Sequence, residues 1–323
     1  GRGGPGEGDH HHEGDAQLTM RERLSPSRAL SLLVAVISIA LVAACSASPD
    51  PTPVPAAATG STSVETPSPD PSVRPGADPL TLPSAHVHAI ARDPGSSKLL
   101  VAAHDGLYVY DGATPKRVGP VIDLMGFTVA GPGHYYASGH PGTATDLPQP
   151  VGLIESRDGG NTWTVLSRGG GSDFHALTTA GSTVVGFDGV LRSTADGRTW
   201  REGNLDAQPR TLAGSRNGST VLATTPEGLM HSIDAGLSWR WTEQAPLLLM
   251  VAFGDGDTVA GLTPDGQVHT STDAGRTWRA TELLAPDAQA LHASGEGEQL
   301  EILVANDRTI LASSGGQPFQ PLR

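Results

Sequence analysis

The apolar positions of this chain fall into short runs separated by turn residues, and the order of these runs repeats. Residues 174–200 read FHALTTAG, STVVGFDG and VLRSTADGRTW, and residues 210–239 and 249–278 follow the same three-part order. Each unit predicts three short strands bounded by Gly, Asp and Pro, and then a fourth strand that starts at a tryptophan. No stretch after residue 45 keeps the 3.6-residue apolar period of a helix, so we expect an all-β protein.

The third run of these units ends in a near-copy of one eight-residue phrase. The copies are SRDGGNTW (156–163), STADGRTW (193–200), SIDAGLSW (232–239) and STDAGRTW (271–278). Their tryptophans are 37, 39 and 39 residues apart, a period typical of a repeated supersecondary unit. Asp and Gly favour a tight turn, and the tryptophan gives the returning strand a large apolar anchor. The repeat therefore predicts a β-propeller built of four-stranded blades.

Flanking segments extend the repeat in both directions. Residues 86–115 and 290–319 match the strand pattern without a complete phrase, and residues 125–163 match it with an insertion between Pro141 and Pro150. The count is six blades, or seven if residues 80–83 contribute a closing strand.

The spacing Ser-x-Asp-x-Gly-x-Thr/Ser-Trp resembles the Asp-box, or bacterial neuraminidase repeat (BNR), of sialidases, sortilin-type receptors and photosystem assembly factors. Three copies fit, and in the second the Asp is displaced by one position. The resemblance implies a structural role for the four box aspartates, Asp158, Asp196, Asp234 and Asp273. The phrases HVHAIARDP, AAHDGLYVY and DFHAL also resemble an actinobacterial group of lipid-anchored propellers labelled as glycosyl hydrolases.

The N-terminal part of the chain is organised differently. Residues 1–19 precede Met20 and are interpreted as an upstream, non-native extension. Residues 20–45 have the basic start, the 16-residue apolar or small run and the small residues before Cys45 of a signal peptide. This segment resembles a bacterial lipobox, which implies cleavage before Cys45 and diacylation of its thiol; an uncleaved anchor with an incidental cysteine is the alternative.

Residues 46–83 predict a tether between that anchor and the propeller at 84–323. Residues 46–84 hold 10 of the 26 prolines and no aromatic residue, so the segment cannot bury enough apolar surface to fold. Since lipidation would use the sole cysteine, no disulfide is expected. We therefore expect a monomeric, extracytoplasmic lipoprotein held to the cell membrane.

Charge excludes one class of function. Without residues 1–44, the chain keeps 17 basic and 29 acidic residues, a formal net charge of −12. Such a domain lacks the positive surface that nucleic acid binding needs, and anionic lipid headgroups would repel it. The predicted anchor, rather than charge, would hold it at the membrane.

Chemistry-bearing residues are concentrated on one predicted face. In a propeller blade, the start of the first strand and the turn after the second strand share a face, opposite the box turns. Five histidines occupy such positions in blades one to three, together with Arg210 at the start of blade four: His86, His88, His104, His140 and His175. Asp105, Asp146, Asp173 and Asp188 accompany the histidines, whereas His134, His231, His269 and His292 are interpreted as structural.

Imidazoles next to carboxylates suit a transition metal such as zinc or copper, and they also suit acid–base chemistry near neutral pH. The simpler interpretation is that the histidines hydrogen-bond to strand ends. We take the five histidines as tentative metal ligands, and the histidines with Arg210 as a candidate surface for a ligand, protein or glycan.

The enzymatic alternative is a glycosyl hydrolase. The chain lacks the Arg-Ile-Pro motif of sialidases, and its four tyrosines have no recognisable glutamate partner, so sialidase chemistry is not expected. Another glycosidase would need two carboxylates across the scissile bond, for which Asp105, Asp173 and Asp188 are candidates. The sequence favours a binding module, with this hydrolase as the alternative.

Overall fold

The computed structural model describes residue 1, residues 80–84 and residues 86–323. The predicted extension, the signal peptide with Cys45 and nearly all of the predicted tether lie outside the described residues. Within the described residues the chain contains 24 strands and one short 3-10 helix (Gly297–Gln299), and no α-helix.

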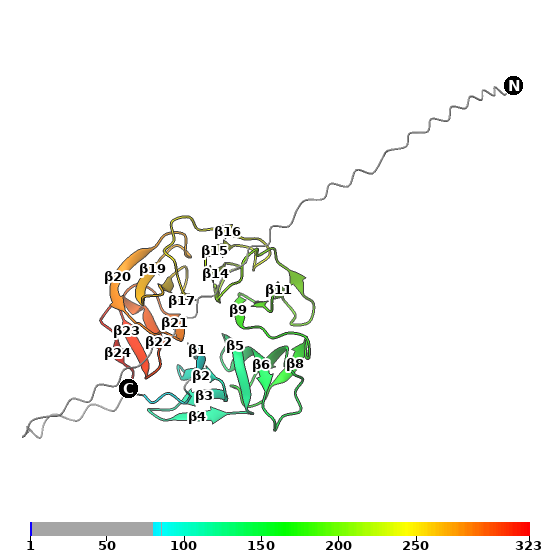
Figure 1. The fold of residues 1–323 in the computed structure, drawn as a ribbon, viewed down its shortest axis with the longest axis horizontal. Coiled ribbons are helices and arrows are strands. Elements are labelled where there is room, and N and C mark those ends of the chain that lie inside the picture. The colour runs from blue at the N-terminus through cyan, green and yellow to red at the C-terminus, as the bar shows by residue number, and fades with distance from the viewer. Residues whose placement is uncertain (2–79, 85) are drawn as a thin grey trace, which may run out of the picture. The chain divides into compact units, whose positions relative to one another are not determined.

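The strands form six separate four-stranded antiparallel sheets, which are the blades of a six-bladed β-propeller (Figure 1). Blade one contains β1 (Val87–Arg92), β2 (Leu99–Ala103), β3 (Gly106–Tyr110) and β4 (Pro115–Val118). Blade two contains β5 (Ile122–Gly131), β6 (His134–Pro141), β7 (Leu153–Ser156) and β8 (Thr164–Ser167). Blade three contains β9 (Ala176–Ala180), β10 (Thr183–Phe187), β11 (Leu191–Thr194) and β12 (Arg201–Glu202).

The other three blades repeat this order. Blade four contains β13 (Thr211–Gly214), β14 (Val221–Thr225), β15 (Gly228–Ser232) and β16 (Arg240–Trp241). Blade five contains β17 (Met250–Phe253), β18 (Val259–Leu262), β19 (Gln267–Ser271) and β20 (Arg279–Leu284). Blade six contains β21 (Ala290–Ser294), β22 (Glu301–Ala305), β23 (Ile310–Ser314) and β24 (Gln320–Pro321). The all-β prediction and the count of six blades are confirmed.

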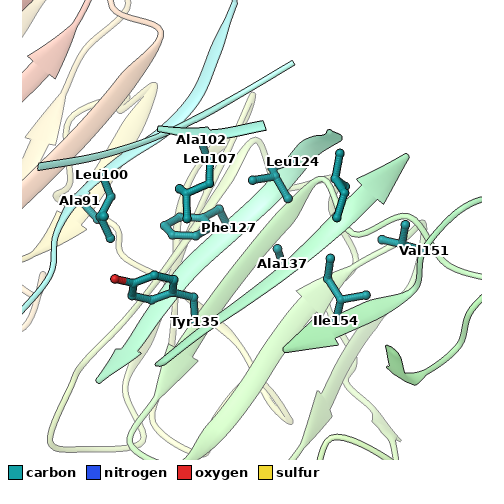
Figure 2. Close-up of a cluster of buried hydrophobic side chains, with 11 residues drawn as sticks. Ala91, Leu100, Ala102, Leu107, Leu124, Phe127, Tyr135, Ala137, Val151 and Ile154 are labelled. Carbon is teal, nitrogen blue, oxygen red and sulfur yellow. The ribbon is translucent and has the colours of Figure 1, made fainter. Parts of the chain in front are cut away.

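Burial changes systematically across each blade. The second strands are apolar and almost wholly buried, as in β2 (LLVAA) and β18 (VAGL), because neighbouring blades cover both of their faces. The outermost strands of blades three and four, β12 and β16, are short and exposed. Figure 2 shows the core between blades one and two, where Leu100 and Leu107 meet Phe127 and Tyr135.

The ring closes by packing between blades six and one rather than by a shared strand. Leu303 and Ile310 of blade six join Val101 of blade one in a single buried cluster. Leu80, which precedes blade one, is 4% exposed in this cluster, and its N–H donates to the carbonyl of Leu322 at 2.8 Å. Residues 80–83 form no seventh blade. Their packing in the core nevertheless extends the folded unit into residues that the sequence analysis assigned to the tether.

The box aspartates organise the turns between third and fourth strands. Asp273 accepts hydrogen bonds from Ser271 Oγ (2.8 Å) and from the Thr277 N–H (2.8 Å) and hydroxyl (2.7 Å). Asp158 and Asp234 make the same set of bonds. In blade three Thr194 takes the place of the serine, donating to Asp196 at 3.0 Å, so this turn is one residue shorter.

Candidate functional site

Two histidines of blade one and an aspartate of blade two form the first cluster. His88 is the second residue of β1, His104 lies in the turn between β2 and β3, and Asp123 is the second residue of β5. His88 Nε2 lies 3.1 Å from Asp123 Oδ1, and His104 Nδ1 lies 2.9 Å from Asp123 Oδ2. One carboxylate therefore faces two imidazoles, with one oxygen directed to each ring.

The inner half of this cluster is buried and incompletely satisfied. His88 Nε2 and Asp123 Oδ1 are buried and form an ion-pair contact at 3.1 Å that falls short of hydrogen-bond geometry. Burial lowers the pKa of His88, while the negative charge of Asp123 opposes that shift. The buried ring nitrogen of His88 thus lies against a carboxylate oxygen, and the pKa of His88 stays below its usual value.

The second cluster joins blades two and three. His140 Nε2 lies 3.1 Å from Asp173 Oδ2, and His175 Nε2 lies 2.6 Å from the same oxygen. The other oxygen, Asp173 Oδ1, is buried without a hydrogen-bond partner. The Gln149 side chain reaches the second ring nitrogen of His140 at 3.0 Å. A partner at that nitrogen fixes the ring orientation, as is usual around metal-binding histidines.

The backbone of blade two brings the clusters next to each other. Asp123 and His140 are directly opposed in the β5–β6 ladder, which is irregular between Asp123 and Gly126. A Cβ at Gly139 would lie 1.9 Å from the Asp123 carbonyl oxygen, and one at Gly126 would lie 2.1 Å from the carbonyl oxygen of Phe174. Glycine at these two positions lets the chain segments carrying both aspartates approach this closely.

A buried aromatic residue anchors the second cluster. Phe174 is fully buried between Asp173 and His175, and its ring stacks on Trp200 at a centroid distance of 5.1 Å. Its N–H also donates to Ser138 Oγ at 2.9 Å. The two flanking ligand candidates are therefore fixed to the core by the residue between them.

Both clusters fit the ligand set of a transition metal. In each, the two imidazole nitrogens and the carboxylate oxygen lie within 4.8 Å of one another. Metal–ligand bonds of about 2.1 Å in a tetrahedral site place neighbouring ligand atoms about 3.4 Å apart. The observed distances between histidine nitrogen and aspartate oxygen are 2.6–3.1 Å, so these atoms would have to move apart by less than about 1 Å to bind a metal. Two imidazoles and one carboxylate would leave one coordination position open.

The predicted site residues do not form one group. His88, His104, His140, His175 and Asp173 enter the two clusters, whereas the ring of His86 belongs to neither. Four of the five histidines taken as tentative metal ligands thus fall into two pairs, each bridged by an aspartate. The side chains from three successive blades reach only their neighbours across one blade junction.

The other predicted acids have different surroundings. Asp105 accepts a hydrogen bond from the Tyr108 hydroxyl at 2.6 Å, and Asp146 is exposed. Asp188 pairs with Arg168 (3.3 Å) and Arg192 (3.2 Å). Burial would raise the pKa of Asp188, but the Ser172 hydroxyl and these arginines outweigh it, so the net pKa is lowered.

Sequence reasoning missed Asp123. Blade two was taken to start at Met125, which excluded Asp123, although the alternation Ile122-Asp123-Leu124 places a polar residue at the beginning of an inner strand. His292 lies on inner strand β21 and lines the central cavity, of about 420 Å³. Its Nε2 accepts the Arg92 N–H at 3.3 Å, and burial lowers the pKa of His292 to about 4.

No protein-family model and no curated protein matches this chain in sequence. Among solved structures it is similar to a GH74 xyloglucanase from Xanthomonas campestris (18% identity, TM-score 0.54, 76% of this chain and 38% of that one). It is also similar to an ancestral GH74 enzyme (11% identity, TM-score 0.50, 73% of this chain and 38% of that one). A third similar structure is the extracellular domain of BT4673 from B. thetaiotaomicron (12% identity, TM-score 0.50, 76% of this chain and 34% of that one).

The chain thus spans little more than a third of the length of these proteins. At these identities the likeness shows the fold alone. Within the described part of the chain, no helix is long and apolar enough to cross a membrane. The comparisons and the geometry together show a β-propeller with two histidine–aspartate clusters that could hold metal ions.

Proposed function

We propose that this protein is a lipid-anchored, extracytoplasmic propeller that binds transition metal ions at its two histidine–aspartate clusters. The observation that carries the proposal is the placement of two imidazoles against one carboxylate in each cluster, together with a buried oxygen, Asp173 Oδ1, that has no hydrogen-bond partner. A buried polar atom without a partner costs about 1–3 kcal/mol, and a bound cation would remove that cost. The anchor rests on the signal-like segment and Cys45, which lie outside the described residues.

The donor set favours zinc or copper over magnesium or calcium. Imidazole nitrogen binds Zn²⁺ and Cu²⁺ well, whereas Mg²⁺ and Ca²⁺ prefer all-oxygen sites. His88, His104 and Asp123 would hold one ion, and His140, His175 and Asp173 the other. A metal at either position supplies a Lewis-acidic site with room for an oxygen or nitrogen donor from a ligand, protein or glycan. His104 and His175, the outer histidine of each cluster, are exposed, so solvent reaches both clusters.

Metal stoichiometry of the full chain tests this function. The protein is stripped with EDTA, equilibrated with zinc or copper, separated from free metal and analysed by elemental mass spectrometry. We expect one ion per cluster, loss of one ion in His88→Ala and in His175→Ala, and loss of both in the double variant. His134→Ala is the matched control, because His134 pairs with Glu155 at 2.8 Å outside the clusters. Metal binding absent from the wild type, or unchanged in the double variant, would refute the proposal.

The alternative function is glycoside hydrolysis. It is favoured by the likeness to GH74 enzymes and by Asp173, a carboxylate with one unpartnered oxygen. Asp188 fits it poorly, because it is paired with two arginines, whereas Asp105 accepts from Tyr108 at one oxygen and keeps the other buried without a partner. Release of reducing sugar from xyloglucan, abolished in Asp173→Asn, would support the hydrolase over the binding module.

A further inference from the structure

A second candidate site lies on the same face, at the junction between blades four and five. A pocket of about 460 Å³ opens there, within the size range of small-molecule sites. Its apolar lining consists of Pro209, Pro226, Leu247, Leu248, Leu249 and Pro264. These residues come from the starts of the inner strands and from the turns after the second strands, the same kinds of position that carry the histidine clusters in blades one to three.

Part of the apolar lining is accessible, and part of it belongs to the core. Leu247 is 50% exposed, which makes it one of the few large apolar side chains that the described surface exposes to this extent. Leu248, by contrast, is 2% exposed and belongs to the core of blades four and five. The pocket therefore has a fixed apolar floor and an exposed apolar rim, and a ligand that covered Leu247 would remove that surface from water.

Arg210 supplies the only charge among the described residues that line this pocket. Its N–H is bonded to the Thr224 carbonyl at 2.8 Å, which fixes its backbone at the start of blade four. Its guanidinium makes no hydrogen bond or ion pair within the described residues, and Arg210 also lines the central cavity. An exposed, unpaired guanidinium next to an apolar pocket can form two parallel hydrogen bonds to a carboxylate.

We propose that this pocket binds a small aliphatic carboxylate, with the apolar chain against Leu247 and the three prolines and the carboxylate on Arg210. The charge pattern of the face supports an anion here, because no acidic residue lines this pocket, whereas the histidine clusters are built around Asp123 and Asp173. The site is separate from the proposed metal function, and neither depends on the other.

Isothermal titration calorimetry on the metal-stripped full chain tests the proposal with octanoate and its neutral counterpart, 1-octanol. A charge-assisted hydrogen bond contributes about 1.5–3 kcal/mol, so octanoate should bind at least about tenfold more tightly than octanol. Arg210→Gln should weaken octanoate to the affinity of octanol and leave octanol unchanged, while Arg210→Lys should retain part of the preference. Leu247→Asp should weaken both ligands.

The matched control is Arg240→Gln, which removes an exposed arginine of β16 that does not line the pocket. Thermal unfolding of each variant reports whether it is folded. Absence of octanoate binding, equal affinity for octanoate and octanol in the wild type, or an unchanged octanoate affinity in Arg210→Gln would each overturn the proposal. None of these results bears on metal stoichiometry, so the two proposals fail separately.

Discussion

Phe174 should contribute both to the stability of the propeller and to the metal affinity of the second histidine–aspartate cluster. The side chain is fully buried, stacks on Trp200 and lies between Asp173 and His175. Phe174→Ala removes a large aromatic side chain from a close-packed core, which costs about 3–5 kcal/mol including the lost aromatic contact. Phe174→Leu keeps much of the volume and should cost less, on the order of 1–2 kcal/mol.

The assay has two parts, carried out on the full chain. Urea unfolding gives the loss of stability, and competition with a chelator gives the zinc or copper affinity of each cluster. We expect the cluster of His140, Asp173 and His175 to lose affinity, because the cavity frees the backbone that holds two of its ligands. The cluster of His88, His104 and Asp123 should keep its affinity.

A second destabilising variant shows whether Phe174→Ala lowers metal affinity by displacing the ligands of the cluster or only by destabilising the whole propeller. Leu303 is fully buried between blades six and one, and Leu303→Ala should cost a similar 2–5 kcal/mol without touching either cluster. If Phe174→Ala cost less than about 1 kcal/mol, the packing argument would be wrong. If Phe174→Ala and Leu303→Ala changed metal affinity equally, Phe174 would have no specific positioning role.

Three further predictions concern the framework. Asp93 is 5% exposed and accepts bonds from the Gly133 N–H and the Tyr135 hydroxyl of blade two, so Asp93→Ala should cost about 2–4 kcal/mol in urea unfolding; a loss below 1 kcal/mol would contradict this. His292 has a folded pKa of about 4 against 6.5 unfolded, so stability present above pH 6.5 should be lost as the pH falls towards 4. The contribution of His292 to the free energy of unfolding is at most about 3 kcal/mol and is reduced by solvent screening, because His292 is partly exposed. His292→Gln should flatten this part of a pH series of urea midpoints, and an unchanged slope would argue against it. Asp273→Ala should cost about 1 kcal/mol, because the Thr277 N–H and hydroxyl lose their acceptor, and an unchanged urea midpoint would show that this turn is held by other contacts.

The fold was predictable because the repeat constrains every blade in the same way. Regular spacing of the tryptophans and the alternation of strands and turns indicated the blade, and counting units gave six. The closure of the ring could not be predicted in the same way. The backbone hydrogen bond from Leu80 to Leu322 joins residues that are far apart in the sequence and belong to no motif.

The candidate site was only partly predictable. The alternation of strand direction indicated which face carries the histidines, but not which side chains reach each other. Asp123 bridges His88 and His104 from an irregular part of β5, and this irregularity depends on close contacts at Gly126 and Gly139 that the sequence pattern does not reveal. The apolar pocket was missed because its leucines and prolines resemble ordinary turn and core residues.

The contrast between the two halves of this face follows from how a propeller is stabilised. Neighbouring blades bury β2, β14 and β18 on both faces, so their side chains must be apolar or, like Thr224 and Thr225, hydrogen-bonded within the fold. The starts of inner strands and the turns after second strands are free of that constraint, so the same position can be His104 in blade one and Pro226 in blade four without altering the sheet. The framework repeats while the chemistry on this face differs from blade to blade. A half with two histidine–aspartate clusters and an apolar, arginine-containing half can therefore coexist around one central cavity.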